Sequence, residues 1–238
     1  MNINRFKSSE NIDRYLAEQM VESIHQNPQM NMGLPTGGTY IGFYEKTTHE
    51  ILKSAIDVKS IQTFNLDRYH NQPKEDDSSY ETFMRRHFFN PLDINAHQTH
   101  FPYYESPQDY GKYDQIIDNS GGLDIILLGI GVNAHIAFNE PGTSFESKTH
   151  KVMLSPSTIN SNQTFFESKD QMPKEAVTMG ISTILNAKKV ILVAKGLNKA
   201  KAVYKMIYDR INESVPATAL RLHENVEVYV DKEAGSLI

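Results

Sequence analysis

The 238-residue chain contains no cysteine. It therefore has no disulfide, no thiolate nucleophile and no thiolate metal ligand, which suits a reducing compartment. Long hydrophobic runs are also missing, because the longest, around "LDIILLGIGV", is too short to span a bilayer. The opening "MNINRFKSSE" lacks the apolar stretch of a secretory signal. These absences predict a cytoplasmic protein with no membrane partner.

Positive charge is scarce as well. The chain has 24 Lys and Arg against 29 Asp and Glu, a formal net charge of −5. Domains that bind nucleic acid usually carry a basic stripe, so this balance argues against a nucleic-acid partner. A small anionic substrate needs only a local positive site. We therefore expect a small-molecule ligand, bound by a monomer or a small homo-oligomer.

The patterns of several well-known catalytic sites are absent. The sequence has no P-loop ending Gly-Lys-Ser/Thr, no dinucleotide fingerprint GxGxxG, no zinc motif HExxH and no nucleophile elbow GxSxG. Its histidines are scattered, and no second histidine lies close in sequence to His135. The sequence therefore predicts neither a metal site nor an organic cofactor.

Four segments have the pattern of helices: 10–26, 39–57, 78–89 and 197–211. In the first, apolar residues recur at fourfold spacing and form one stripe: Ile12, Leu16, Met20 and Ile24. Thr39 is the expected N-cap of the second helix, and Ser78 or Ser79 that of the third. Each helix is therefore expected to pack one face against a core.

Short apolar segments lie between these helices. A short strand is expected between the first two helices, and further strands at 61–66, 123–129, 188–196 and 226–231. "LDIILLG" and "KKVILVAKG" are almost continuously apolar, which is typical of strands buried on both faces. Strands that alternate with helices form parallel βαβ units. The sequence therefore predicts one α/β domain over residues 1–238, with a doubly wound, mostly parallel sheet between helices in a Rossmann-like three-layer arrangement.

Three polar segments follow predicted strands: "LPTGGT" at 34–39, "FNLDRY" at 64–69 and "LGIGVNAHIAFNEPG" at 128–142. Ligands of open parallel sheets collect at the carboxyl ends of the strands. Gly37 and Gly38 would let backbone N–H groups approach an anion, with Thr39 at a helix N-terminus. A plain tight turn into a helix explains the same residues.

The other two segments supply an acid and an imidazole. Asp67 leaves an apolar strand, where partial burial can move its pKa toward a range useful for proton transfer. His135 follows the most apolar strand, and Glu140 could orient its imidazole. Taken singly, a capping aspartate, a structural histidine and a solvated glutamate remain possible interpretations.

The order of "LPTGGT", "FNLDRY", "GIGVNAHIAFNEPG" and "GLNKA" resembles the glucosamine-6-phosphate deaminase family over nearly the whole chain. The resemblance implies a doubly wound α/β fold. It also implies isomerisation with deamination, in which glucosamine 6-phosphate and water give fructose 6-phosphate and ammonia. No cofactor is needed, because a positioned carboxylate can move a proton between carbons beside a carbonyl.

The resemblance also assigns roles to residues. Asp67 would move the proton from C2 toward C1 of the opened sugar. His135 would assist ring opening, and Glu140 would hold His135 in its working state. Thr36, Gly37, Gly38, Thr39 and Lys199 would bind the phosphate. Asn133 stands where some family members carry an aspartate that completes the relay of His135 and Glu140, while other members also use asparagine.

One departure from the family pattern bears on the substrate. Ile159 stands where members commonly carry an arginine that contacts the phosphate. We therefore expect either that another cation such as Lys148 compensates or that the substrate is a related sugar phosphate such as galactosamine 6-phosphate. Two further hypotheses are a 6-phosphogluconolactonase and a non-catalytic sugar-phosphate-binding protein. "FNEPG" argues against the lactonase, and the retained acid and base groups argue against a pure binder.

Overall fold

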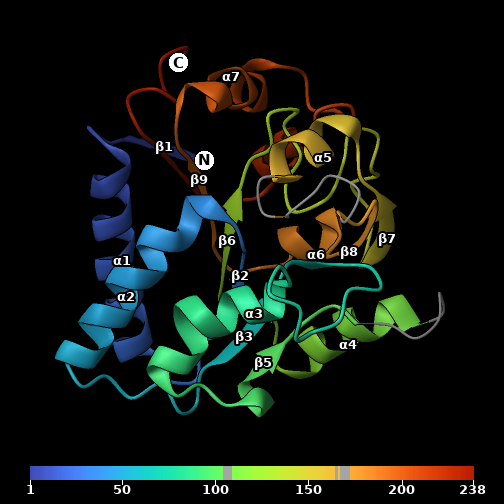
Figure 1. Ribbon diagram of the computed structural model, residues 1–238. Helices are drawn as coiled ribbons and strands as arrows, with labels where there is room; N and C mark the ends of the chain where they lie inside the picture. The colour runs from blue at the N-terminus through green and yellow to red at the C-terminus, as the bar shows by residue number, and fades with distance from the viewer. Residues whose placement is uncertain (104–108, 164–165, 167–171) are drawn as a thin grey trace.

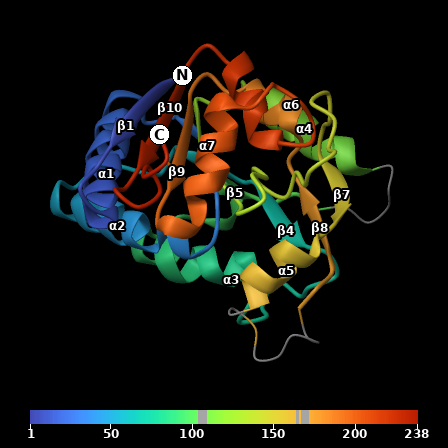
Figure 2. The same ribbon diagram turned by 90° about the horizontal axis from the view of Figure 1, so that it is seen from above.

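The computed structural model describes residues 1–103, 109–163, 166 and 172–238. Its centre is a seven-stranded sheet in which each hydrogen-bonded pair of strands is parallel (Figures 1 and 2). In spatial order the strands are β1 (Asn2–Arg5), β10 (Val226–Val230), β9 (Val190–Ala194), β6 (Ile125–Gly129), β2 (Asn31–Leu34), β3 (Gln62–Asn65) and β5 (Thr99–His100).

This strand order is doubly wound, which confirms the predicted fold class. From β2 the chain moves outward through β3 to β5, returns to the other side of β2 as β6, and continues through β9 to β10. The neighbours β2 and β6 therefore flank the point where the winding reverses. In folds of this kind the crevice beyond the carboxyl ends of such strands is the usual ligand site.

Helices cover both faces of the sheet (Figure 2). Side chains of α1 (Ser9–Gln26) and α2 (Ile41–Lys53) pack with Ile125 and Leu127 of β6 in one core cluster. Side chains of α4 (Tyr110–Asn119), α6 (Ile181–Leu185) and α7 (Ala200–Tyr208) pack with Ile126 and Leu128 in the other. Alternate residues of β6 thus enter opposite cores, as its continuous apolar sequence predicted.

None of the helices in the described ranges is long and apolar enough to cross a membrane. Two further helices, α3 (Tyr80–Met84) and α5 (Pro156–Asn162), lie beside the carboxyl ends of the central strands (Figure 1). Both begin at a serine whose hydroxyl accepts a backbone N–H. Ser79 accepts from Thr82 at 3.0 Å, and Ser155 accepts from Thr158 at 3.3 Å. Ser79, one of the two serines predicted for this position, is therefore the N-cap of α3.

A second, antiparallel sheet was not predicted. It contains β4 (Asp67–Tyr69), β8 (Glu175–Thr178) and β7 (His150–Met153) in that order. Only Leu66 separates β3 from β4, so the chain passes directly from the parallel sheet into the antiparallel one. Asp67 stands at this junction.

Three predicted helices differ from their observed bounds by more than one residue, and the one predicted at 197–211 is α-helical only over α7 (Ala200–Tyr208). Thr39 is not the N-cap of α2, because residues Gly38–Tyr40 form a 3₁₀ turn and the helix starts at Ile41 without a side-chain cap. The helix predicted at 78–89 is α-helical only to Met84 and continues as a π-helical turn, Arg85–Phe89. A π-turn rotates the side chains that follow it, and such turns are frequent at functional sites.

Candidate active site

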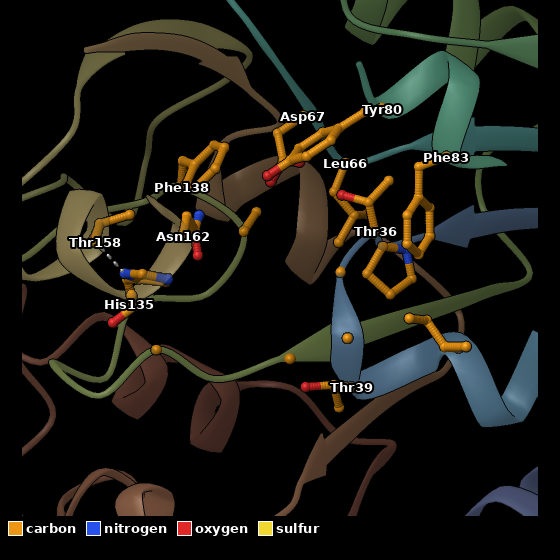
Figure 3. A pocket seen from close by; sticks show the side chains of 18 of the residues that line it. Thr36, Thr39, Leu66, Asp67, Tyr80, Phe83, His135, Phe138, Thr158 and Asn162 are labelled. Atoms are coloured by element: carbon orange, nitrogen blue, oxygen red, sulfur yellow. Dashed lines mark hydrogen bonds between the residues drawn. The ribbon is translucent and has the colours of Figure 1, made fainter. Parts of the chain in front are cut away.

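A cavity of about 500 Å³ opens at the carboxyl ends of β2 and β6 (Figure 3). Seven of the residues predicted for the site line it: Thr36, Gly37, Gly38, Thr39, Asp67, His135 and Lys199. They come from four separate segments, which follow β2, β3, β6 and β9. The doubly wound topology therefore gathers the phosphate-binding candidates and the acid–base candidates around one space.

The glycine turn after β2 has a conformation that its sequence explains. Gly37 has φ of 98°, in the left-handed region that side chains disfavour. The 3₁₀ turn Gly38–Tyr40 follows directly. The buried Tyr40 hydroxyl donates a hydrogen bond to the Leu128 carbonyl at 2.9 Å, which ties the turn to β6. The turn is therefore fixed to the strand that leads to His135.

Lys199 enters the cavity from the segment between β9 and α7. It is the last residue of a 3₁₀ turn, Leu197–Lys199, directly before α7 begins. Burial lowers the pKa of the Lys199 ammonium, because removal from water disfavours the charged form. A bound anion would compensate for this loss of hydration.

Asp67 is buried, with 8% of its surface exposed. This burial raises the pKa of Asp67 from 3.8 to about 7. Figure 3 shows the carboxyl group beside the ring of Tyr80, on the cavity side of the β3–β4 junction. A carboxyl group with a pKa near neutrality can both accept and return a proton, as a general base that shuttles a proton must.

His135 is held by a compact turn. The backbone N–H of Gly131 donates to the His135 carbonyl at 2.9 Å, and the His135 N–H donates to the Asn133 side-chain oxygen at 3.2 Å. The imidazole Nδ1 lies 3.3 Å from the Thr158 hydroxyl, the dashed contact in Figure 3. These contacts fix the ring in the wall of the cavity.

Glu140 lies behind His135, and neither Glu140 nor Asn133 is among the described residues that line the cavity. The Asn133 amide donates to Glu140 Oε2 at 2.6 Å, and the Ser155 N–H donates to Oε1 at 3.1 Å. Thr158 donates its hydroxyl to the same Oε1, and His135 Nδ1 lies 3.6 Å from Oε2. Burial alone would raise the pKa of Glu140, but these contacts outweigh it and lower the pKa to about 2. The anion therefore faces the imidazole at neutral pH.

Sequence reasoning missed two residues at this site. Thr158 bridges His135 and Glu140, and Tyr80 lies beside Asp67. A signal for Thr158 was present, because "SPST" places it three residues after the serine that caps α5. Tyr80 follows the predicted cap Ser79, but nothing in its local sequence links it to Asp67.

Two expectations about the phosphate site are not supported. Lys148 does not line the cavity and instead borders a separate hollow near Asp114 and Thr183. Ile159 packs against the small hydrophobic cluster around Tyr69 and Phe138, whereas its neighbour Thr158 lines the cavity. Neither Lys148 nor Ile159 is therefore among the described residues that line the cavity.

Gly131 supports the imidazole, and we predict that Gly131→Ala lowers activity. A Cβ atom at this position would lie 2.5 Å from ring atoms of His135, which is closer than van der Waals contact permits. The ring must then move, and a misplacement of about 1 Å can reduce turnover about a hundredfold. Steady-state kinetics would measure this, with Gly111→Ala as the control because its Cβ meets nothing within 4 Å and Gly111 does not line the cavity. Equal losses in both variants would contradict the explanation.

The fold is that of a known enzyme family. A family model described as "Glucosamine-6-phosphate isomerases/6-phosphogluconolactonase" matches residues 5–229, and the chain belongs to that family.

Among the described residues no group of three or more His, Asp or Glu side chains is arranged to hold a metal ion.

Within the family, curated relatives carry the name glucosamine-6-phosphate deaminase. One from Bacillus pumilus (strain SAFR-032) is 40% identical over 240 residues, which cover the whole of both chains. Another, from Clostridium botulinum (strain Alaska E43 / Type E3), is 42% identical over 93% of this chain and 90% of its own length. A solved structure described as a monomeric glucosamine-6-phosphate deaminase matches with a TM-score of 0.96 and 38% identity over the whole of both chains.

The lactonases of the family share the fold at lower similarity. The structure of 6-phosphogluconolactonase from Trypanosoma cruzi matches with a TM-score of 0.79 and 22% identity, over 99% of this chain and 96% of its own. At that identity the match is evidence for the fold alone.

Proposed function

We propose that this protein is a glucosamine-6-phosphate deaminase that converts glucosamine 6-phosphate and water to fructose 6-phosphate and ammonia. The proposal depends most on one observation. Asp67 and His135 line the same cavity as the glycine turn and Lys199. Relatives of this name at about 40% identity over the full chain support the same activity.

The phosphate anchors the substrate at one end of the cavity. Thr36, Gly37, Gly38 and Thr39 would supply backbone N–H and hydroxyl groups, and Lys199 would supply a cation. Because the phosphate takes no part in bond breaking, its binding energy is available to hold the flexible open-chain sugar in a reactive pose.

The proton transfers occur at the other end. His135 would protonate the ring oxygen and accept the proton of the C1 hydroxyl, which opens the ring to an aldehyde. Glu140 stabilises the cationic imidazole, and Asn133 holds Glu140 in place. Asp67 then takes the C2 proton while the His135 imidazolium returns a proton to the C1 oxygen, which gives an enolamine. Asp67 delivers its proton to C1, which leaves a C2 iminium. Water adds to this carbon and ammonia departs, so the ketose is formed without a cofactor.

A lactonase is the second candidate, because the matched family includes such enzymes. Hydrolysis of a lactone needs no proton transfer between adjacent carbons, so one general base such as His135 is enough, whereas isomerisation gives Asp67 a separate role. The presence of Asp67 in the cavity therefore favours the deaminase. Deamination of the epimer galactosamine 6-phosphate would use the same chemistry, so an assay with both amino sugars distinguishes the two substrates.

The proposal is tested by measuring ammonia and fructose 6-phosphate from glucosamine 6-phosphate. Galactosamine 6-phosphate and 6-phosphogluconolactone are assayed in parallel. We expect ammonia and ketose in equal amounts from glucosamine 6-phosphate and a lower kcat/KM for the other two. Turnover of the lactone without release of ammonia from either amino sugar would overturn the proposal.

Arg86 is predicted to be the second cation on the phosphate. Apart from the histidines, Arg86 and Lys199 are the cations among the described lining residues, and Lys148 is not one of them. Arg86 belongs to the π-helical turn and pairs with Asp77 at 3.5 Å, where both side chains are exposed. Exposed pairs contribute little stability, so the guanidinium can turn to a phosphate at low cost. Arg86→Gln should raise KM about tenfold and change kcat little.

Arg85→Gln is the matched control for this prediction, because Arg85 lies in the same turn, is exposed and does not line the cavity. Steady-state kinetics of both variants would give the comparison. An equal rise in KM for Arg85→Gln and Arg86→Gln would show that only the general charge of the surface matters. No rise in KM for Arg86→Gln would contradict its role as a phosphate ligand.

We propose that one copy of the chain, folded as a single domain over residues 1–238, contains the whole site. The solved relative described as monomeric shares the fold of this chain over its whole length. The soluble sugar-phosphate substrate also suits a cytoplasmic enzyme. Size-exclusion chromatography with light scattering should therefore give the mass of one 27.1 kDa chain.

A further inference from the structure

A largely buried ion pair lies behind the glycine turn, outside the cavity. Lys195 is the first residue after β9, and its ammonium donates to Asp13 Oδ1 on α1 at 2.5 Å. The same ammonium donates to the backbone carbonyl of Thr39. The side chains of Lys195 and Asp13 are 14% and 10% exposed. Neither residue lines the cavity, whereas Thr39 does (Figure 3).

The position of Asp13 is itself constrained by a close approach of two helices. A Cβ atom on Gly42, in the first turn of α2, would lie 2.5 Å from Asp13 Oδ2. A side chain at position 42 would therefore push the Asp13 carboxylate away from this position. The arrangement joins α1, the end of β9 and the start of α2 at the carbonyl of Thr39.

We propose that Lys195 is a positioning residue for the sugar phosphate, acting through the carbonyl of Thr39. A hydrogen bond from a cation to that carbonyl fixes the orientation of the peptide that ends the glycine turn, and charge-assisted bonds are the stronger kind. The turn then presents its N–H groups and hydroxyls in one arrangement before the anion arrives, which reduces the entropy lost on binding. The inference rests on the proposed phosphate site.

Lys195 and Lys199 lie on the same short segment between β9 and α7. Lys199 lines the cavity from one side, and Lys195 holds the turn from behind. This segment thus supplies one cation that lines the cavity and a second that contacts the glycine turn.

Stability alone is a weak reason for such a pair. Removing two charges from water offsets most of their mutual attraction, so buried ion pairs often add little to the free energy of unfolding. Burial raises the pKa of Asp13 in spite of the opposing effect of Lys195. The contact to Thr39 connects the ion pair to the proposed phosphate site, which a purely structural ion pair would not require.

The test compares Lys195→Met with Asp13→Asn. Both substitutions break the same ion pair, so a merely structural role predicts that both weaken phosphate binding along with stability. In the proposed role, Lys195→Met removes the bond to Thr39 and raises both KM and the inhibition constant of inorganic phosphate about tenfold, with kcat changed less than about threefold. Asp13→Asn retains an acceptor for Lys195 and leaves its positive charge uncompensated, so the inhibition constant should stay the same or fall.

Three additions complete the experiment. Lys188→Met is the control, because Lys188 lies just before β9 at its other end and pairs with Asp124 at the surface. Lys195→Arg should restore most of the phosphate affinity. If Lys195→Met does not fold, Lys195→Gln replaces it with the same expected direction, because the shorter side chain does not reach Thr39.

Parallel weakening in Lys195→Met and Asp13→Asn, or no change in Lys195→Met, would overturn the inference. Binding of inorganic phosphate is also measured by calorimetry, without turnover. If the wild-type chain binds phosphate in a Lys195-dependent way but releases no ammonia, the proposed deaminase activity fails and the positioning role stands.

Discussion

Asp67→Asn is expected to reduce the kcat of ammonia release about a thousandfold, within the range lost when a general base is removed. Asparagine keeps the size and one oxygen of the side chain but cannot take the C2 proton. The KM should change little, because the residues proposed to bind the phosphate come from other segments of the cavity lining. Exchange of the C2 proton with deuterated solvent, followed by NMR, should be lost in the same variant.

The same substitution should make the protein more stable. The folded pKa of Asp67 is raised to about 7. An aspartate of this kind lowers stability as the pH rises from its unfolded pKa of about 4 to about 7, because the folded state then has to give up a proton that it binds more tightly. Asparagine has no charge to bury, so Asp67→Asn should gain up to about 4 kcal/mol at pH 8 and nothing below about pH 4.

Asp118→Asn is the control for both effects, because Asp118 is an exposed aspartate on α4 away from the cavity. Activity and denaturant unfolding would be measured on the same preparations. An Asp67→Asn variant that loses stability as well as activity would mean that the carboxylate holds the fold together and would remove the case for a proton shuttle.

Glu140→Gln is expected to lower kcat about a hundredfold, since the imidazolium formed on His135 would lose its anionic partner. The amide also presents an N–H₂ group where Glu140 accepts from Asn133, Thr158 and the Ser155 backbone. The pKa of Glu140 is lowered to about 2. Its ionised form therefore stabilises the wild type above about pH 4, and this contribution is lost as the pH falls toward about 2.

Glu146→Gln is the matched control, because Glu146 is exposed in the same loop. Kinetics and acid unfolding curves of the two variants would be compared with wild type. The unfolding curves of Glu140→Gln and wild type should converge as the pH approaches about 2. Unchanged turnover in Glu140→Gln would contradict the assigned role.

The sequence predicted the central strands well and the short elements poorly. "LDIILLG" and "KKVILVAKG" became β6 and β9 because a continuous apolar run has few other stable environments. The antiparallel strands β4, β7 and β8 have three or four residues each and mixed polarity, so no periodicity marks them. Their pairing depends on contacts between segments far apart in the chain.

The site residues that follow the central strands could also be predicted, whereas those on the short elements could not. Asp67, His135 and Lys199 could be placed together because the carboxyl ends of parallel strands meet at one edge of the sheet. Lys148 and Ile159 could not be placed, since only the packing of α5 and the antiparallel sheet determines which side chains face the cavity. The contacts of Lys195 could not be predicted either, because its partners Asp13 and Thr39 are distant in sequence.

The most direct test of the central claim measures ammonia and fructose 6-phosphate produced from glucosamine 6-phosphate by wild type, Asp67→Asn and Asp118→Asn. The account predicts equal amounts of the two products from wild type and Asp118→Asn, and almost none from a folded and more stable Asp67→Asn. Ammonia released by Asp67→Asn at the wild-type rate, or by none of the three proteins, would contradict it.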